Sequence, residues 1–151
     1  MDDDTPYRLH HSLGYHLSVA SRLQERRLDE DLKRLGLTRI TWCILLAVGN
    51  EGLTQPSEIA DFVGIDRTAT SRALRRMEAD GLVERASGTE DRRTRRVALK
   101  RKGRNLIGQA TIRARDNAAQ IERALTDAEQ AELKRLLGKL RKAGNGPLPT
   151  L

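Results

Sequence analysis

Two groups of arginine residues lie close together in the stretch DRTATSRALRRMEADGLVERASGTEDRRTRRVAL, which spans residues 66–99. The first group occupies a segment with the periodicity of a helix, and the second occupies a segment with the pattern of a β-hairpin. Between Arg85 and Arg104 the chain carries nine basic residues and two acids, an excess equal to the formal net charge of the whole protein, +7. A surface of mixed solvated charges is the ordinary explanation for charged residues, but this concentration favours a polyanionic partner.

The helical segment over residues 67–80 separates its residue types by face. At 100° per residue, one face is expected to pack inward, and it carries Ala69, Thr70, Ala73, Leu74 and Met77. The opposite face carries Thr68, Arg72 and Arg75, with Ser71 and Arg76 on its flanks. Short hydroxyl groups followed by arginines suit a helix in the major groove of DNA, where arginine forks onto guanine O6 and N7. An amphipathic helix with solvated arginines is the alternative interpretation.

The neighbours of this segment favour the interpretation as a DNA-binding helix. SEIADFVG forms a short helix before it, and the turn GID gives the two-helix spacing of a helix-turn-helix. The hairpin after it, LVERAS and RRVAL around GTEDRR, carries arginines at its tip, which can enter the minor groove. Two arginine clusters are therefore expected to contact two grooves.

Length and composition limit the other possibilities. The 151 residues, 38% hydrophobic and only 3% aromatic, suit one mostly helical globular unit. No apolar run approaches the ~20 residues that span a bilayer, and the N-terminus lacks the pattern of a signal peptide, so we expect a cytoplasmic protein without a membrane partner. The single cysteine, Cys43, excludes an intrachain disulfide.

The order of predicted elements is a long helix, three short helices, a hairpin, a long helix and a last helix. The predicted fold class is mainly α with a small β-hairpin wing: a winged helix-turn-helix DNA-binding lobe over residues 36–100, and a helical dimerisation region over 7–35 and 101–143. Residues 144–151 are expected to form a flexible tail. The outer helices carry apolar stripes that 151 residues cannot cover, so we predict a homodimer.

The chain resembles the MarR (multiple antibiotic resistance regulator) family of winged-helix transcription factors. The resemblance lies in GLT at 36–38, in TQPSEIADFVGIDRTATSRALRRMEADGLVER at 54–85, and in DRR followed by VAL-x-x-x-G at 91–103. It implies that Asp91 and Arg93 occupy the family's D-x-R wing motif, with Arg93 in the minor groove, and that Ser71 and Arg72 match its Thr-Arg pair. Lys100 departs from the Thr or Ser that commonly begins the fifth helix, which weakens the expected helix cap.

The resemblance also implies a dimer that binds a pseudo-palindromic operator, mostly as a repressor, and that releases DNA when a small ligand binds. The predicted DNA contacts come from the recognition helix (67–80) and the wing (88–95): Arg67, Thr68, Thr70, Ser71, Arg72, Arg75, Asp91, Arg92, Arg93 and Arg95.

Fewer residues are candidates for sensing a ligand than for contacting DNA. Tyr15, His16, Arg22 and Trp42 are candidates for a ligand pocket, with Arg22 as a carboxylate clamp and Trp42 alternatively a core anchor. The opening SLGYHLSVASRL resembles regulators of aromatic-acid catabolism, so an aromatic carboxylate or its CoA thioester is the candidate effector. His10, His11 and His16 lack the spacing of a metal site, and the apolar surroundings of Cys43 argue against redox sensing.

Two other functional classes compete with a specific regulator. A non-specific nucleic-acid-binding architectural protein would use the same charge only for phosphates, and it would show a steep salt dependence without site preference. An enzyme would need a nucleophile–base pair, a metal cluster or a phosphate-binding glycine loop, and none is recognisable. We therefore expect no catalytic residues, no metal and no cofactor.

Overall fold

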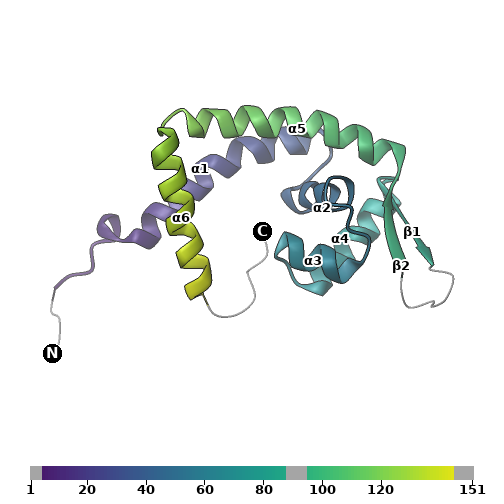
Figure 1. Cartoon of the computed structure of the whole chain (residues 1–151), viewed down its shortest axis with the longest axis horizontal. Helices are drawn as coiled ribbons and strands as arrows, with labels where there is room; N and C mark the ends of the chain where they lie inside the picture. The colour runs from purple at the N-terminus through teal and green to yellow at the C-terminus, as the bar shows by residue number, and fades with distance from the viewer. Residues whose placement is uncertain (1–4, 88–94, 145–151) are drawn as a thin grey trace.

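The computed structural model describes residues 5–87 and 95–144, except for the side chains of Ser87 and Arg95. Within these ranges the chain forms helices and one two-stranded antiparallel sheet (Figure 1). The elements in order are η1 (Leu9–His11), α1 (Leu13–Arg34), α2 (Arg39–Gly49), α3 (Pro56–Val63), α4 (Arg67–Ala79), β1 (Val83–Ser87), β2 (Arg95–Leu99), α5 (Arg101–Glu122) and α6 (Asp127–Ala143). The predicted fold class is confirmed: the molecule is mainly helical with a hairpin wing.

Most helix ends lie where local sequence chemistry places them. The Thr38 and Thr41 side chains form a capping box at the start of α2, and Thr126 and Glu129 form another at the start of α6. Gly64 ends α3 with a φ of 81°, a left-handed conformation that glycine adopts without steric cost. The first helix differs from the prediction, because it begins at Leu13 rather than near Tyr7. Ser12 is extended and its Oγ accepts the amide proton of Tyr15, so it caps α1.

The hydrophobic core lies in the lobe built from α2, α3, α4 and the hairpin, and both long helices contribute to it. Its fully buried side chains are Leu32, Ile44, Leu45, Ile59, Leu74, Met77, Val83, Val97 and Thr70. Burial of each large aliphatic side chain contributes about 1.5–3 kcal/mol to stability. The C-terminal end of α1 belongs to this core through Leu32, with Leu28 and Leu35 packed against it. The lobe is therefore attached to α1 by apolar contacts at one end of that helix.

The hairpin is joined to the rest of the lobe at both of its strands. β1 and β2 pair antiparallel with Val83 opposite Leu99 and Arg85 opposite Val97. The Val97 amide donates to the Thr54 carbonyl at 2.8 Å, and the Lys100 amide donates to the Leu82 carbonyl at 2.9 Å. Val83 and Val97 alternate with exposed residues, so one face of the hairpin closes the core. The base of the wing is consequently held rigidly.

The long helices α1 and α5 lie side by side, and α6 crosses the far end of α5 (Figure 1). Asn117 on α5 is 5% exposed, and its Nδ2 donates to the Gln24 carbonyl on α1 at 3.0 Å. Large apolar side chains remain exposed along these helices: Leu13, Leu17 and Leu23 on α1, Ile112 and Ile121 on α5, and Leu133, Leu136, Leu137 and Leu140 on α6. None of the residues of α6 is buried. No helix in the described parts of the chain is long and apolar enough to cross a membrane.

The start of α5 depends on a close backbone approach. Lys100 makes no side-chain cap hydrogen bond, in agreement with the weak cap expected there. Two residues into the helix, Gly103 is buried, and a Cβ atom at this position would collide with the carbonyl oxygen of Leu82. That oxygen belongs to the backbone and already accepts the Lys100 amide, so it cannot move aside freely. Only glycine lets α5 leave the hairpin at this distance.

We therefore expect Gly103→Ala to lower the free energy of unfolding by about 1–3 kcal/mol through overpacking. Gly108→Ala is the matched control, because a Cβ atom there meets nothing within 4 Å. In the control the higher helix propensity of alanine should raise stability by about 0.5–1 kcal/mol. Urea unfolding followed by circular dichroism measures both changes. Equal effects of the two substitutions would contradict the close-approach argument.

Candidate nucleic-acid interface

Helix α4 is positioned by its cap and by its buried face. Asp66 accepts the Ala69 amide through Oδ1 at 2.7 Å and so begins the helix, and Gly81, with a φ of 74°, follows its C-terminal end. Thr70, Leu74 and Met77 are each at most 1% exposed and point into the core. The rotation of the helix about its axis is thereby set, since these three residues lie on one face.

The opposite face of α4 presents positive charge and hydroxyl groups to solvent. Arg67, Thr68, Ser71, Arg72 and Arg75 line a shallow depression of about 450 Å³ on this face. Four of these side chains are exposed, and Ser71 is half-buried. The structure thus brings together five of the six residues that the sequence predicted as DNA contacts on this helix. The side chains that line the depression are arginine, threonine and serine, all of which can hydrogen-bond to a base edge or a phosphate.

Thr70 requires a correction, because it cannot belong to this surface. It is 1% exposed, and its Oγ1 donates to the Asp66 carbonyl at 2.9 Å. The hydroxyl is satisfied inside the protein, where it strengthens the start of α4. Its inclusion among the predicted DNA contacts was wrong, and the helical wheel, which placed Thr70 on the inward face, was right.

The helix before α4 gives the arrangement of a helix-turn-helix. α3 ends at Gly64, and Ile65, which is 7% exposed, anchors the turn in the core. α3 packs against both α2 and α4. The turn therefore connects two packed helices, and α4 is the second of them, the position of a recognition helix.

Three side chains of the dense basic block between Arg85 and Arg104 bind groups of the protein itself. Arg85 donates through Nε and Nη2 to Oε2 of Glu78 at 2.9 and 2.7 Å, and its side chain is 16% exposed. Lys102 donates to the Asp80 carbonyl and Arg104 to the Leu99 carbonyl, each at 2.9 Å. These three cations fasten α4 and α5 to the hairpin. The block is therefore partly structural, which its charge pattern alone does not reveal.

The tip of the wing lies outside the described residues. Asp91, Arg92 and Arg93 belong to that stretch, and the side chain of Arg95 is not described either. The roles expected for them on DNA remain predictions. The described strands β1 and β2 extend from the start of α5 toward the side of the molecule on which α3 and α4 lie (Figure 1).

The candidate ligand residues fall into two separate environments. Tyr15 is half-buried, its ring stacks on His10 with centroids 4.8 Å apart, and it meets the edge of the His16 ring at 5.6 Å. Arg22 is exposed, and its Nε donates to the Ser18 carbonyl at 3.4 Å on the same helix. Trp42 is 6% exposed and belongs to the core of the lobe, the alternative role considered for it.

A cleft that the sequence did not indicate lies at the corner between α1 and α2. Its volume is about 600 Å³, and it is lined by Asp29, Lys33, Gly36, Leu37, Thr38, Arg39, Ile40 and Arg76. Three cations and one acid therefore face it. Its residues come from α1, the following turn, the start of α2 and the end of α4. No local spacing connects Lys33 with Arg76, so only the tertiary structure reveals this site.

The structure bears on two possible means of sensing, a reactive cysteine and a bound metal ion. Burial raises the pKa of the Cys43 thiol above its ordinary value, although the nearby Arg39 charge opposes the shift. A raised pKa keeps the thiol protonated at neutral pH and therefore poorly nucleophilic, as expected from the sequence. Within residues 5–87 and 95–144, no group of three or more His, Cys, Asp or Glu side chains is placed to hold a metal ion.

Comparison with known proteins relates this surface to one family. Residues 35–94 match the model of the MarR family. A probable transcriptional regulator from Pseudomonas aeruginosa superposes with a TM-score of 0.78 at 25% identity, over 88% of this chain and 99% of that one. A mutant of MarR from E. coli in complex with operator DNA gives a TM-score of 0.77 at 27% identity, over 85% and 92% of the two chains.

BpsR from Bordetella bronchiseptica, whose DNA binding is regulated by 6-hydroxynicotinic acid, has the same fold. Its TM-score is 0.83 at 22% identity, over 93% of this chain and all of that one. The family model matches the part of the lobe from α2 to β1, and the structural matches at 25% and 27% identity extend over both long helices, so the chain is similar to transcriptional regulators of the MarR family.

Proposed function

We propose that this protein is a dimeric, ligand-responsive transcriptional repressor that binds a pseudo-palindromic operator. The observation that carries the proposal is the outward face of α4, on which three arginines and two hydroxyl residues line one solvent-facing depression. In a major groove, Arg72 and Arg75 can fork onto guanine, while Thr68 and Ser71 can contact base edges or phosphates. The N-terminus of α4 favours a phosphate. Arg93 at the wing tip enters the neighbouring minor groove in this proposal.

The protein contacts of three cations in the basic block support specific recognition over the architectural alternative. A protein that uses charge only for phosphates gains most when its cations are free. Here Arg85, Lys102 and Arg104 bind protein groups instead and hold α4 and the hairpin in a fixed relation. Fixed geometry serves base recognition, because bidentate contacts tolerate little displacement.

The exposed apolar stripes support the dimer. Leu133, Leu136, Leu137 and Leu140 recur at helical spacing on α6 and are 38–46% exposed. A helix of 17 residues with no buried side chain is marginal in water, because packing supplies most helical stability. A second copy would cover these leucines together with those at the N-terminal end of α1. We therefore assign residues 7–35 and 101–143 to dimerisation, and 36–100 to DNA binding.

The effector of the proposed regulator is an aromatic carboxylic acid or its CoA thioester. The acid that regulates BpsR has this chemistry, which supports the class without identifying the compound. Two places on this chain suit an anion next to an apolar surface: the Tyr15, His16 and Arg22 group on α1, and the cleft lined by Lys33 and Arg76.

The dimer predicts a mass of twice 16.9 kDa by light scattering at micromolar concentration. Leu136→Glu should shift this mass toward the monomer, because it places a charge in the apolar stripe that the second copy would bury. Lys142→Glu, on the opposite face of α6, changes charge by more and should leave the dimer intact. A monomeric wild-type protein would remove this part of the proposal.

Specific binding is tested by incubating the protein with sheared genomic DNA at physiological salt and sequencing the retained fragments. We expect a small set of sites that share an inverted repeat with half-sites about one helical turn apart. The genes beside them would nominate the effector. Retention of all sequences in proportion to their amount would instead establish the architectural alternative.

Arg72→Ala should weaken binding to the selected operator by roughly 1–3 kcal/mol and relax base preference at one position of each half-site. Arg76→Ala is the control on the same helix, since Arg76 lies toward Asp80 and the cleft rather than in the α4 depression. Titration of operator variants by fluorescence anisotropy separates the two. Equal loss on every duplex would make Arg72 a phosphate contact.

A further inference from the structure

Arg39 occupies a position that local helix physics disfavours. It is the first residue of α2, where the unpaired amides and the helix dipole make the potential positive. The rest of α2, ITWCILLAVG, contains no acid that could pair with it along the helix. An arginine here therefore needs partners from elsewhere in the fold.

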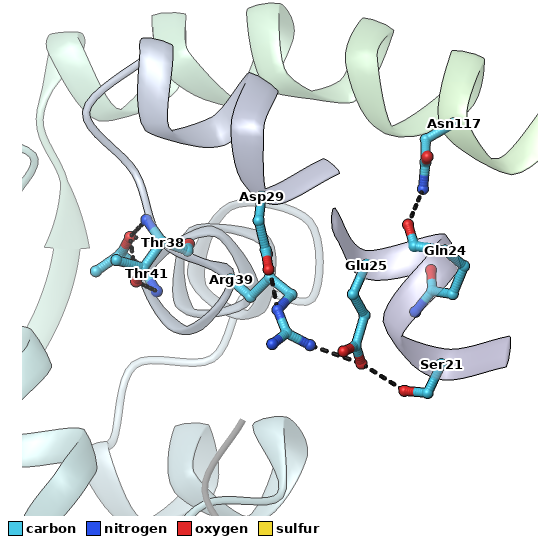
Figure 2. A network of polar contacts seen from close by, with 8 residues as sticks. All are labelled: Ser21, Gln24, Glu25, Asp29, Thr38, Arg39, Thr41 and Asn117. Carbon is cyan, nitrogen blue, oxygen red and sulfur yellow. Dashed lines mark hydrogen bonds and ion pairs between the residues drawn. The ribbon is translucent and has the colours of Figure 1, made fainter. Parts of the chain in front are cut away.

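Two carboxylates of α1 supply those partners (Figure 2). Nη1 of Arg39 lies 2.7 Å from Oε1 of Glu25, and its Nε lies 2.8 Å from Oδ1 of Asp29. The two acids are one helical turn apart, so a single guanidinium spans them. Ser21 Oγ donates to the same Glu25 oxygen at 2.9 Å and orients that carboxylate. The Arg39 and Glu25 side chains are only 25% and 24% exposed, so water screens this pair less than a surface pair.

These contacts differ from the other ion pairs of the described residues in what they join. Four pairs, those of Arg26, Arg34, Arg76 and Arg135, connect residues three or four apart on one helix. The Arg85–Glu78 pair joins α4 to β1 inside the lobe. Only the two Arg39 pairs, among these, connect α1 with the lobe.

The same turn of α1 also holds α5. The Gln24 carbonyl accepts the hydrogen bond from buried Asn117, while the adjacent Glu25 binds Arg39 (Figure 2). Consecutive residues of α1 are thus tied to the long helix on one side and to the lobe on the other. The apolar attachment, formed by Leu28, Leu32 and Leu35, begins about one turn further along α1 and continues to the C-terminal end of the helix. The polar contacts of Glu25 and Asp29 therefore extend the attachment of the lobe toward the N-terminal end of α1, and they restrain the angle between α1 and α2.

We propose that Arg39 is a positioning residue that sets the angle between the lobe and α1, and so the separation of the two recognition helices in the dimer. It acts through Glu25 and Asp29 and does not touch DNA. α2 transmits the angle because Ile44 and Leu45 pack it into the same core as Leu74 and Met77 of α4. The proposal rests on the dimeric operator binding proposed above, and its first test is independent of that function.

The first test measures the distance between α1 and the lobe without DNA. Spin labels at Arg27→Cys on α1 and Asp61→Cys on α3, both exposed positions, are introduced in a Cys43→Ser background. Dilution with unlabelled protein leaves only distances within one chain. Arg39→Gln should roughly double the width of the distance distribution, because the polar part of the attachment between α1 and the lobe is lost. The helix start should persist, since the Thr38–Thr41 capping box remains and an unfavourable charge is removed.

Two further variants separate positioning from general damage. Arg26→Gln is the matched control, since it removes an arginine that pairs with Glu30 on α1 alone, and it should leave the width unchanged. Arg39→Lys keeps the charge but lacks the planar fork that reaches both acids, so it should give an intermediate width. A width in Arg39→Gln equal to that of Arg26→Gln would overturn the proposal.

The second test uses unlabelled protein and the selected operator. Arg39→Gln should bind the native operator roughly tenfold more weakly, which corresponds to about 1.4 kcal/mol. Its affinity for a single half-site should be unchanged, and its preference for native spacing over spacing altered by one base pair should fall by the same factor. Uniform loss on half-sites and full operators would overturn the proposal. If no operator exists, the functional proposal fails, and the distance measurement alone decides whether Arg39 holds the angle.

Discussion

Burial of one face of α4 is the constraint on which the rest of the binding surface depends. Leu74 and Met77 pack between α2, α3 and the hairpin, and the Thr70 hydroxyl donates to the Asp66 carbonyl at the start of the helix. Removal of two large side chains from water is worth several kcal/mol, far more than any preference of exposed arginines for one direction. The rotation of α4 is therefore decided by its apolar side. Arg67, Arg72 and Arg75 face solvent as a consequence.

Charge in this protein has two physical roles that composition cannot separate. Arg39, Arg85, Lys102 and Arg104 each bind a carboxylate or a carbonyl of another element, and they set the relation between helices and hairpin. The arginines of the α4 depression remain in solvent. Cations that already have fixed partners lose little more side-chain freedom when a ligand binds, so they provide a rigid frame for the exposed arginines of α4.

The long helices α1 and α5 orient the lobe, but large apolar side chains on their own surfaces remain exposed. α1 and α5 are held together by buried Asn117 and by apolar contacts near the lobe, whereas their distant ends and α6 expose leucine and isoleucine. The lobe buries its apolar side chains within one chain, whereas the far end of the molecule leaves large apolar side chains exposed. The exposed ends of the long helices are continuous with the segments that pack against the lobe and orient α4.

Much of this organisation follows from the sequence alone, and the remainder depends on contacts between distant residues. Thr38, Asp66, Gly64 and Gly81 determined helix ends, because capping and left-handed turns are local interactions within a few residues. The period of Leu74 and Met77 likewise determined which face of α4 turns outward. The tertiary structure decided that Arg85 and Lys102 bind groups at the C-terminal end of α4. It also decided that Arg39 pairs with acids of α1, and that Lys33 and Arg76 line one cleft. Those outcomes require side chains separated by many residues to meet in space, and no local periodicity carries that information.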